Sequence, residues 1–230
     1  MDIGIIGAGN IGGTLAKSLK ALGHRVSLAN SRGSATLSEF VAATGVSAAT
    51  IEEAAAAKDL VIIAIPKLAM PNLPREVFRA NPAVVVDAGN YYPTRDGTIE
   101  QIDRGLTESE WTSSILGRPV DKAFNNIHAE SLATKGNCDE RAARVALSVA
   151  GDSLEAKNLI QDLIRALGFD AVDAGSLTES WRQQLGTPAY CKDLNPAELS
   201  AALKQADSSQ IAHYRKQADD AAAPYLMPFQ

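Results

Sequence analysis

The residues best suited to chemistry stand near the N-terminus, where three glycines follow a short apolar run. Gly7, Gly9 and Gly12 form the pattern G-x-G-x-x-G directly after Ile3–Ile6, and apolar residues at helical spacing follow. In a strand–turn–helix unit the first glycine permits a tight turn, the second lets a pyrophosphate approach the backbone, and the third lets helix and strand pack closely. Because amides at a helix start favour phosphate, the pattern predicts a dinucleotide site; the alternative is a structural turn.

The end of the next apolar run distinguishes between the two nicotinamide dinucleotides. Asn30, Ser31 and Arg32 stand there, with no carboxylate beside them. An acidic residue at this place holds the ribose 2′-hydroxyl of NAD, whereas an arginine accommodates the 2′-phosphate of NADP. The guanidinium of Arg32 can form charged hydrogen bonds to that phosphate. These residues favour NADP, the alternative being a solvated surface arginine.

Further candidates follow later apolar runs, where ligands bind in open α/β sheets. Asn90 comes after Asp87-Ala-Gly and is predicted to contact the nicotinamide side, unless it is an ordinary turn asparagine. Tyr91 and Tyr92 could stack on a flat ring or cover the core. Lys122 and His128 are the nearest acid–base candidates, although a residue in such a position is more often structural or solvated than catalytic. No catalytic side chain is therefore assigned.

The elements that must position these residues alternate between strands and helices. The predicted strands are 3–6, 25–29, 60–65, 83–87, 120–124, 145–150 and 169–172, and the predicted helices are 11–22, 38–43, 51–57 and 153–167. This order predicts an α/β fold with a doubly wound, mostly parallel Rossmann sheet over residues 1–175. From residue 176 to 230 the chain is polar and alanine-rich, which predicts a small helical C-terminal extension.

Composition excludes several classes of function. A net charge of −5 over 230 residues argues against nucleic acid or an anionic membrane as partner. The longest apolar run, 60–66, is too short to span a bilayer, and no basic leader precedes the first strand, so we expect a cytoplasmic protein. The two cysteines, Cys138 and Cys191, lie far apart without a metal-ligand pattern, so neither a zinc site nor a disulfide is expected.

Four segments resemble the coenzyme F420-dependent NADP oxidoreductase family. They are IGIIGAGNIGGTLAKSLKALGHRVSLANSRG at 3–33, VVDAGNYYPTRDG at 85–97, VDKAFNNIHAESL at 120–132 and FDAVDAGSLTESWRQQLGTPAY at 169–190. The first is shared with many Rossmann enzymes, whereas the set of four is specific and covers nearly the whole chain. The resemblance implies a Rossmann domain whose small C-terminal extension contributes to a homodimer.

The resemblance also implies residue roles. The implied NADP contacts are Gly9, Asn10, Ile11, Ser31, Arg32, Ile65 and Pro66. A deazaflavin pocket beside the nicotinamide would draw on the stretch from Asn125 to His128, and these two residues are the predicted substrate contacts. Archaeal members carry other residues at both positions, so a plain flavin stays open beside F420 as the acceptor.

The residues and the resemblance together predict an NADPH-dependent oxidoreductase that transfers hydride between NADP(H) and a flavin-like or deazaflavin acceptor. Hydride transfer between two rings needs alignment and exclusion of water more than an acid–base pair. Two alternatives stay open, namely a reductase of a small imine or carbonyl compound and a non-catalytic NADPH sensor.

Overall fold

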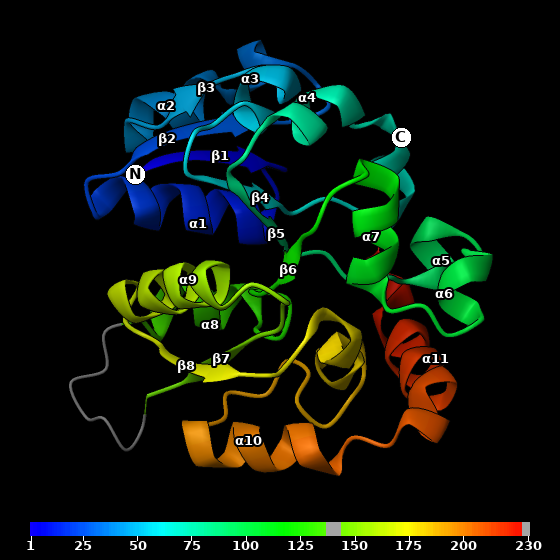
Figure 1. The fold of residues 1–230 in the computed structure, drawn as a ribbon. Coiled ribbons are helices and arrows are strands. Elements are labelled where there is room, and N and C mark those ends of the chain that lie inside the picture. The colour runs from blue at the N-terminus through cyan, green and yellow to red at the C-terminus, as the bar shows by residue number, and fades with distance from the viewer. Residues whose placement is uncertain (137–143, 227–230) are drawn as a thin grey trace.

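A six-stranded parallel sheet forms the centre of the computed structural model, which describes residues 1–136 and 144–226 (Figure 1). Its strands are β1 (Asp2–Ile6), β2 (Arg25–Ala29), β3 (Ser47–Ala48), β4 (Leu60–Ile63), β5 (Val84–Asp87) and β6 (Asp121–Lys122). Their order is β3-β2-β1-β4-β5-β6, so the order reverses between β1 and β4. The doubly wound parallel sheet predicted from the sequence is confirmed, and ligands bind at such a reversal.

Helices cover both faces of this sheet. The helices are α1 (Asn10–Ala21), α2 (Ser38–Thr44), α3 (Ile51–Ala55), α4 (Arg75–Ala80), α5 (Pro93–Asp96), α6 (Glu100–Asp103), α7 (Glu108–Leu116), α8 (Ala129–Thr134), α9 (Leu154–Ala166), α10 (Pro196–Gln205) and α11 (Ile211–Ala222). Along β4, Leu60 and Ile62 enter the core shared with α1 and α9, whereas Val61 and Ile63 enter the core shared with α3, α4 and α7. Burial on both faces explains the continuous apolar runs.

The strands after β6 form a sheet of their own. β7 (Ala146–Val149) and β8 (Asp170–Asp173) pair in parallel as a two-stranded sheet. An isolated antiparallel bridge between Lys122 and Ala150 joins it to β6, with N–H···O distances of 2.8 and 3.0 Å. The predicted strands are therefore present; β3 is an additional strand, and the strand predicted over 120–124 shortens to the two residues of β6.

The C-terminal extension packs on the chain that carries it. It runs from a 3₁₀ segment, Leu177–Gln183, through α10 and α11. Leu199 and Leu203 of α10 are buried against β7 and β8. On α11, Asp219 accepts hydrogen bonds from the amide and hydroxyl of Thr94, which brings the helix against α5. The boundary near residue 175 stays a prediction, because these contacts cross it.

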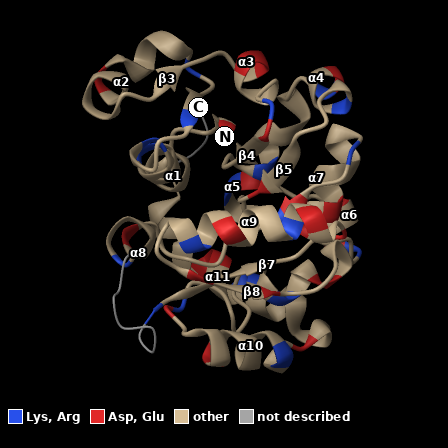
Figure 2. Cartoon of the chain, turned by 60° about the vertical axis from the view of Figure 1, so that its left-hand side comes forward, with Lys and Arg blue, Asp and Glu red and all other residues tan. Residues whose placement is uncertain are grey.

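Acidic and basic residues occur together in the same helices, as in α4, α9 and α10 (Figure 2). Within the described ranges, no helix is long and apolar enough to cross a bilayer.

Candidate dinucleotide and acceptor site

The glycine turn after β1 has a geometry that only glycine fits at two positions. Gly7 has φ +112°, and a Cβ there would lie 2.2 Å from the carbonyl oxygen of Ala64. A Cβ on Gly12 would lie 1.9 Å from the carbonyl oxygen of Gly7, so its absence lets α1 pack onto the turn. At Gly9, by contrast, no described atom lies within 4 Å of the Cβ position. The turn is thus tight on its protein side and open where a pyrophosphate would approach.

The start of α1 is suited to an anion. Gly9 is the N-cap residue, its position offers no side-chain cap, and the first turn has no acidic residue. The free amides and the positive end of the helix dipole therefore face the open side of the turn. Asn10 and Ile11 line the cavity beside it.

The side chain of Asn30 fixes the shape of the loop after β2, because both its amide oxygen and its amide nitrogen form hydrogen bonds within that loop. The Asn30 Oδ1 accepts a hydrogen bond from the Arg32 amide at 3.1 Å, and its Nδ2 donates to the Thr36 hydroxyl at 2.9 Å. Ser31 and Arg32 are exposed and line a cavity of about 330 Å³ with Gly7 and Gly9. Asn30 also lines this cavity, and its side chain fixes the loop that carries Ser31 and Arg32.

A second cavity, of about 430 Å³, continues from the first at the carboxyl ends of β1, β4 and β5. The two share Gly9, Ala64, Ile65 and Pro66. Together they form one elongated site at the strand-order reversal. Ile65 and Pro66 stand at its middle, where the predicted dinucleotide would pass from one half to the other.

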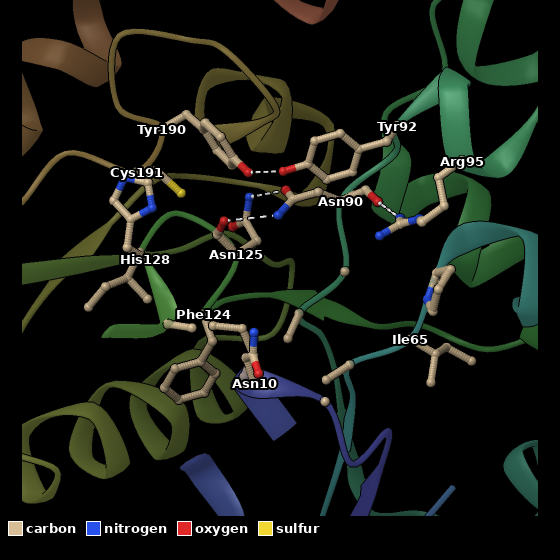
Figure 3. Close-up of a pocket in the computed structure, with 18 of the residues that line it drawn as sticks. Asn10, Ile65, Asn90, Tyr92, Arg95, Phe124, Asn125, His128, Tyr190 and Cys191 are labelled. Carbon is tan, nitrogen blue, oxygen red and sulfur yellow. Dashed lines mark hydrogen bonds between the residues drawn. The ribbon is translucent and has the colours of Figure 1, made fainter. Parts of the chain in front are cut away.

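Two asparagines form the wall of the second cavity. The Asn90 Nδ2 donates to the Asn125 carbonyl at 3.1 Å, and the Asn125 Nδ2 donates to the Asn90 Oδ1 at 3.0 Å (Figure 3). Asn125 is buried, and its amide also exchanges hydrogen bonds with Gln183. The structure thus brings both predicted residues together, but most of the hydrogen-bonding capacity of Asn125 is used within the protein.

Backbone strain accompanies this wall. Phe124 is fully buried and has φ +62°, a conformation that costs a bulky residue free energy. Cys191, across the cavity, has φ +47°, and its amide donates to the carbonyl of Asn126 at 3.1 Å. Both strained residues line the cavity. Such conformations are held only where the surrounding packing determines them, and they concentrate at functional sites.

Two tyrosine hydroxyls meet at the side of the cavity away from the glycine turn. The Tyr92 and Tyr190 oxygens lie 2.5 Å apart, although the residues are separated by 98 positions (Figure 3). The Arg95 guanidinium lies 5.0 Å from the Tyr92 ring centroid and also donates to the Asn90 carbonyl at 2.8 Å. Burial raises the pKa of both tyrosines, so both hydroxyls keep their protons at neutral pH.

The neighbouring Tyr91 has a different role. Its side chain is fully buried, its hydroxyl donates to the Gly97 carbonyl at 2.9 Å, and it accepts from the Ile99 amide at 3.0 Å. Tyr91 therefore belongs to the core, whereas Tyr92 lines the cavity. The sequence left both roles open for each residue.

His128 and Cys191 complete the far end of the cavity. His128 is exposed, precedes α8, and lines the cavity beside Cys191 (Figure 3). Burial raises the pKa of the Cys191 thiol to about 11, so it is no thiolate nucleophile at neutral pH. No group of histidine, cysteine, aspartate and glutamate that could hold a metal occurs among the residues that the structure describes. Cys138 lies outside those residues.

Lys122, the other acid–base candidate, is buried away from the cavity. Its Nζ donates to the Gly89 carbonyl at 2.6 Å and to Glu108 at 3.1 Å. Lys67 lies nearby and donates to Asp87 at 2.5 Å, and all four charged side chains are fully buried. Burial alone would raise the pKa of Asp87, but Lys67 and Lys122 lower it to about 2. Lys122 thus belongs to a buried charge cluster, which consists of Lys67, Asp87, Glu108 and Lys122 and lies under the loop that carries Gly89.

Sequence reasoning missed several residues of the second cavity. Arg95, Tyr190, Cys191 and Leu226 line it but were not predicted. The available signal was the family resemblance, because Arg95 lies in segment 85–97 and Tyr190 ends segment 169–190. Leu226 and Tyr190 come from the extension, so that part of the chain contributes directly to the site.

The strand order and the glycine turn after β1 define a Rossmann-fold dinucleotide-binding protein. Residues 2–91 match the family model described as NADP oxidoreductase, coenzyme F420-dependent. Over these residues the chain matches a family of NAD(P)-dependent oxidoreductases.

Two solved structures share the fold of this chain. The fold is similar to hypothetical protein SMa0349 from Sinorhizobium meliloti, with a TM-score of 0.74 and 33% identity over 85% of this chain and 96% of that one. A candidate F420-dependent NADP reductase from Arthrobacter sp. FB24 shares the fold, with a TM-score of 0.64 and 23% identity over 78% of this chain and 87% of that one.

Two curated relatives are matched over part of their length. YjhV of Escherichia coli K12 is 42% identical over 67 residues, which are 29% of this chain and 49% of YjhV. Rat metalloreductase STEAP3 is 27% identical over 179 residues, which are 77% of this chain and 34% of STEAP3. The matched region thus spans about half of the first relative and a third of the second.

Proposed function

We propose that the protein is an NADPH-dependent reductase that transfers hydride to a flavin-like tricyclic acceptor, F420 or a plain flavin. The observation that carries this proposal is the joined pair of cavities, one at the glycine turn and one beyond Pro66. A dinucleotide would lie along the first and reach the second with its nicotinamide. The second cavity leaves about 430 Å³ for that ring and an acceptor.

NADP fits the residues of the first cavity. The amides at the start of α1 would hold the pyrophosphate, since Gly9 leaves that space open. Ser31 and Arg32 would hold the 2′-phosphate, and Asn30 fixes their loop. When bound, the dinucleotide supplies the hydride. The exposed guanidinium and the absence of a carboxylate in the 29–33 stretch support NADP over NAD.

The second cavity suits a flat acceptor with carbonyl groups at its edge. Its described lining includes the aromatic rings of Tyr92 and Tyr190 and the amides of Asn10 and Asn90, but no aspartate or glutamate. Lys122, which could have served a proton-abstracting mechanism, is committed to the buried charge cluster. What remains is a surface that aligns two rings, and alignment is the main requirement of ring-to-ring hydride transfer.

Stopped-flow absorbance with NADPH tests the proposal, using F420, FMN, FAD and riboflavin in turn. We expect at least one to oxidise NADPH faster than the uncatalysed control, and FMN or riboflavin to suffice if the pocket takes a plain flavin. If none does while an aldehyde or imine is reduced, the flavin assignment is wrong. If nothing oxidises bound NADPH, a sensor is the remaining function.

Reduction of a small imine or carbonyl compound is the second candidate. The hydroxyl pair of Tyr92 and Tyr190 favours it, because such a substrate needs a donor at its heteroatom as hydride adds. The same absorbance assay with an aldehyde and a cyclic imine separates the two candidates.

A further inference from the structure

The protons of the tyrosine pair can be counted. Two hydroxyls 2.5 Å apart share one hydrogen bond, which uses one of their two protons. Burial raises the pKa of both groups, so neither proton is lost at neutral pH. The second proton therefore stays available to a partner, and both side chains line the cavity where one would lie.

The neighbours of the pair favour donation into the cavity. The Cys191 thiol contacts the Tyr190 hydroxyl, but sulfur is a weak acceptor that an oxygen or nitrogen of a ligand outcompetes. The Arg95 guanidinium lies over the Tyr92 ring, and its positive charge opposes the rise that burial causes in the pKa of Tyr92, which favours donation by that hydroxyl. Arg95 is itself fixed by Asp96 and by the Asn90 carbonyl.

The two tyrosines come from different parts of the chain. Tyr92 directly precedes α5, in the loop that carries Asn90 after β5, whereas Tyr190 stands in the extension between the 3₁₀ segment and α10. Figure 3 shows their hydroxyls meeting across the cavity from Asn10 and Ile65. An acceptor lying over the nicotinamide would therefore have the glycine turn on one side and the hydroxyl pair on the other.

We propose that Tyr92 and Tyr190 act together as the hydrogen-bond donor to the acceptor heteroatom that gains charge during hydride transfer. The inference rests on the proposed function. The C4–H bond of the reduced nicotinamide breaks and its hydride forms a new bond on the acceptor, which is thereby reduced while the nicotinamide is oxidised. The acceptor heteroatom, which gains negative charge, accepts a hydrogen bond from the free hydroxyl, both tyrosines keep their protons, and solvent supplies the one proton that neutralises the reduced acceptor.

The proposal assigns a role to the C-terminal extension. One of the two hydroxyls comes from the extension. The extension therefore selects acceptors that place a carbonyl, imine or ring nitrogen beside the hydroxyl pair. A purely one-electron acceptor without such an atom would gain nothing from the pair.

Single-turnover stopped-flow with NADPH and FMN tests the pair in the full chain, using Tyr92→Phe, Tyr190→Phe and the double variant. We expect each single variant to slow hydride transfer about tenfold or more at saturating FMN. The double variant should be no slower than the slower single variant, since the two hydroxyls act as one donor. The Kd of NADPH should not change. Tyr214→Phe, a half-buried tyrosine outside the cavity, is the matched control and should leave the rate unchanged.

A second measurement does not depend on turnover. Quenching of riboflavin fluorescence by the NADP⁺-loaded protein gives a Kd, which should rise several-fold in both single variants and stay constant in Tyr214→Phe. Variants that bind and reduce flavin as the wild type does, or that lose NADPH affinity as much as rate, would overturn the tyrosine proposal alone. A wild-type protein that neither binds nor reduces any flavin would overturn the proposed function and this inference with it.

Discussion

Arg32 is the residue whose charge can separate the two nicotinamide cofactors. Replacing it with alanine removes the charged hydrogen bonds that we expect to the 2′-phosphate of NADP. Such a loss corresponds to about 1.5–3 kcal/mol, or roughly tenfold or more in affinity. We predict that Arg32→Ala weakens NADPH by that factor and leaves NADH nearly unchanged, as measured by isothermal calorimetry.

The matched control is Arg104→Ala, another exposed arginine, which pairs with Glu100 on α6 away from the glycine turn. It should change neither Kd. If Arg32→Ala lowered the affinities for NADPH and NADH equally, the arginine would shape the loop and would not bind the 2′-phosphate.

At the scale of elements, the carboxyl ends of β4, β5 and β6 converge on the buried charge cluster. We predict that Lys122→Met lowers the free energy of unfolding by about 3–5 kcal/mol, because it leaves the buried carboxylate of Glu108 without its cation. Urea denaturation followed by circular dichroism measures the change. Lys216→Met, whose exposed partner is Asp220, should change it by no more than about 0.5 kcal/mol.

The same variant distinguishes a structural role of Lys122 from a catalytic one. If Lys122→Met were as stable as the wild type but lost hydride transfer, the acid–base role that the sequence left open would return. Loss of stability together with retained NADPH binding in the folded fraction would support the structural role.

The junction between the two sheets contains a further buried carboxylate, Asp121 of β6. Burial first, and then Asp152, raises its pKa from 3.8 to about 7, and its Oδ1 has no hydrogen-bond partner among the described residues. Since the folded pKa lies above the unfolded one, the folded state binds the extra proton between these values. The contribution of Asp121 to the free energy of unfolding is therefore largest below the unfolded pKa and is lost as the pH rises through about 7.

We predict that the free energy of unfolding of the wild type falls by roughly 1 kcal/mol per pH unit across that window, relative to Asp121→Asn. Urea denaturation of both proteins at about pH 5 and about pH 8 measures the difference, since other titrating groups cancel between them. An identical pH dependence in both proteins would show that Asp121 has an ordinary pKa.

At the scale of the whole molecule, the prediction concerns the oligomeric state. The apolar residues of α10 are already buried within one chain, so the extension does not need a second subunit to cover them. The homodimer implied by the family resemblance stays a prediction. Multi-angle light scattering at micromolar concentration should give twice the chain mass of 24.2 kDa, and a monomer mass would refute it.

Several features of the protein follow from the sequence alone because they are local. The glycine turn can be recognised because a tight turn and a close helix contact exclude a Cβ at Gly7 and Gly12, whatever the rest of the chain does. The apolar runs of β1 and β4 predict strands buried on both faces, and their alternation with helices predicts the doubly wound sheet. The exposed Ser31 and Arg32 likewise follow directly from the strand before them.

Only the tertiary structure decided what depends on residues distant in the chain. Tyr92 and Tyr190 meet because the extension folds back over the carboxyl ends of the strands, and no spacing in the sequence encodes that contact. Its position at a strand end makes Lys122 a candidate base in the sequence, but in the structure it forms a buried ion pair with Glu108 of α7. Side-chain periodicity reports which face of an element is apolar, whereas the partner of a polar group is set by packing between elements, and the chemistry of this site depends on those partners.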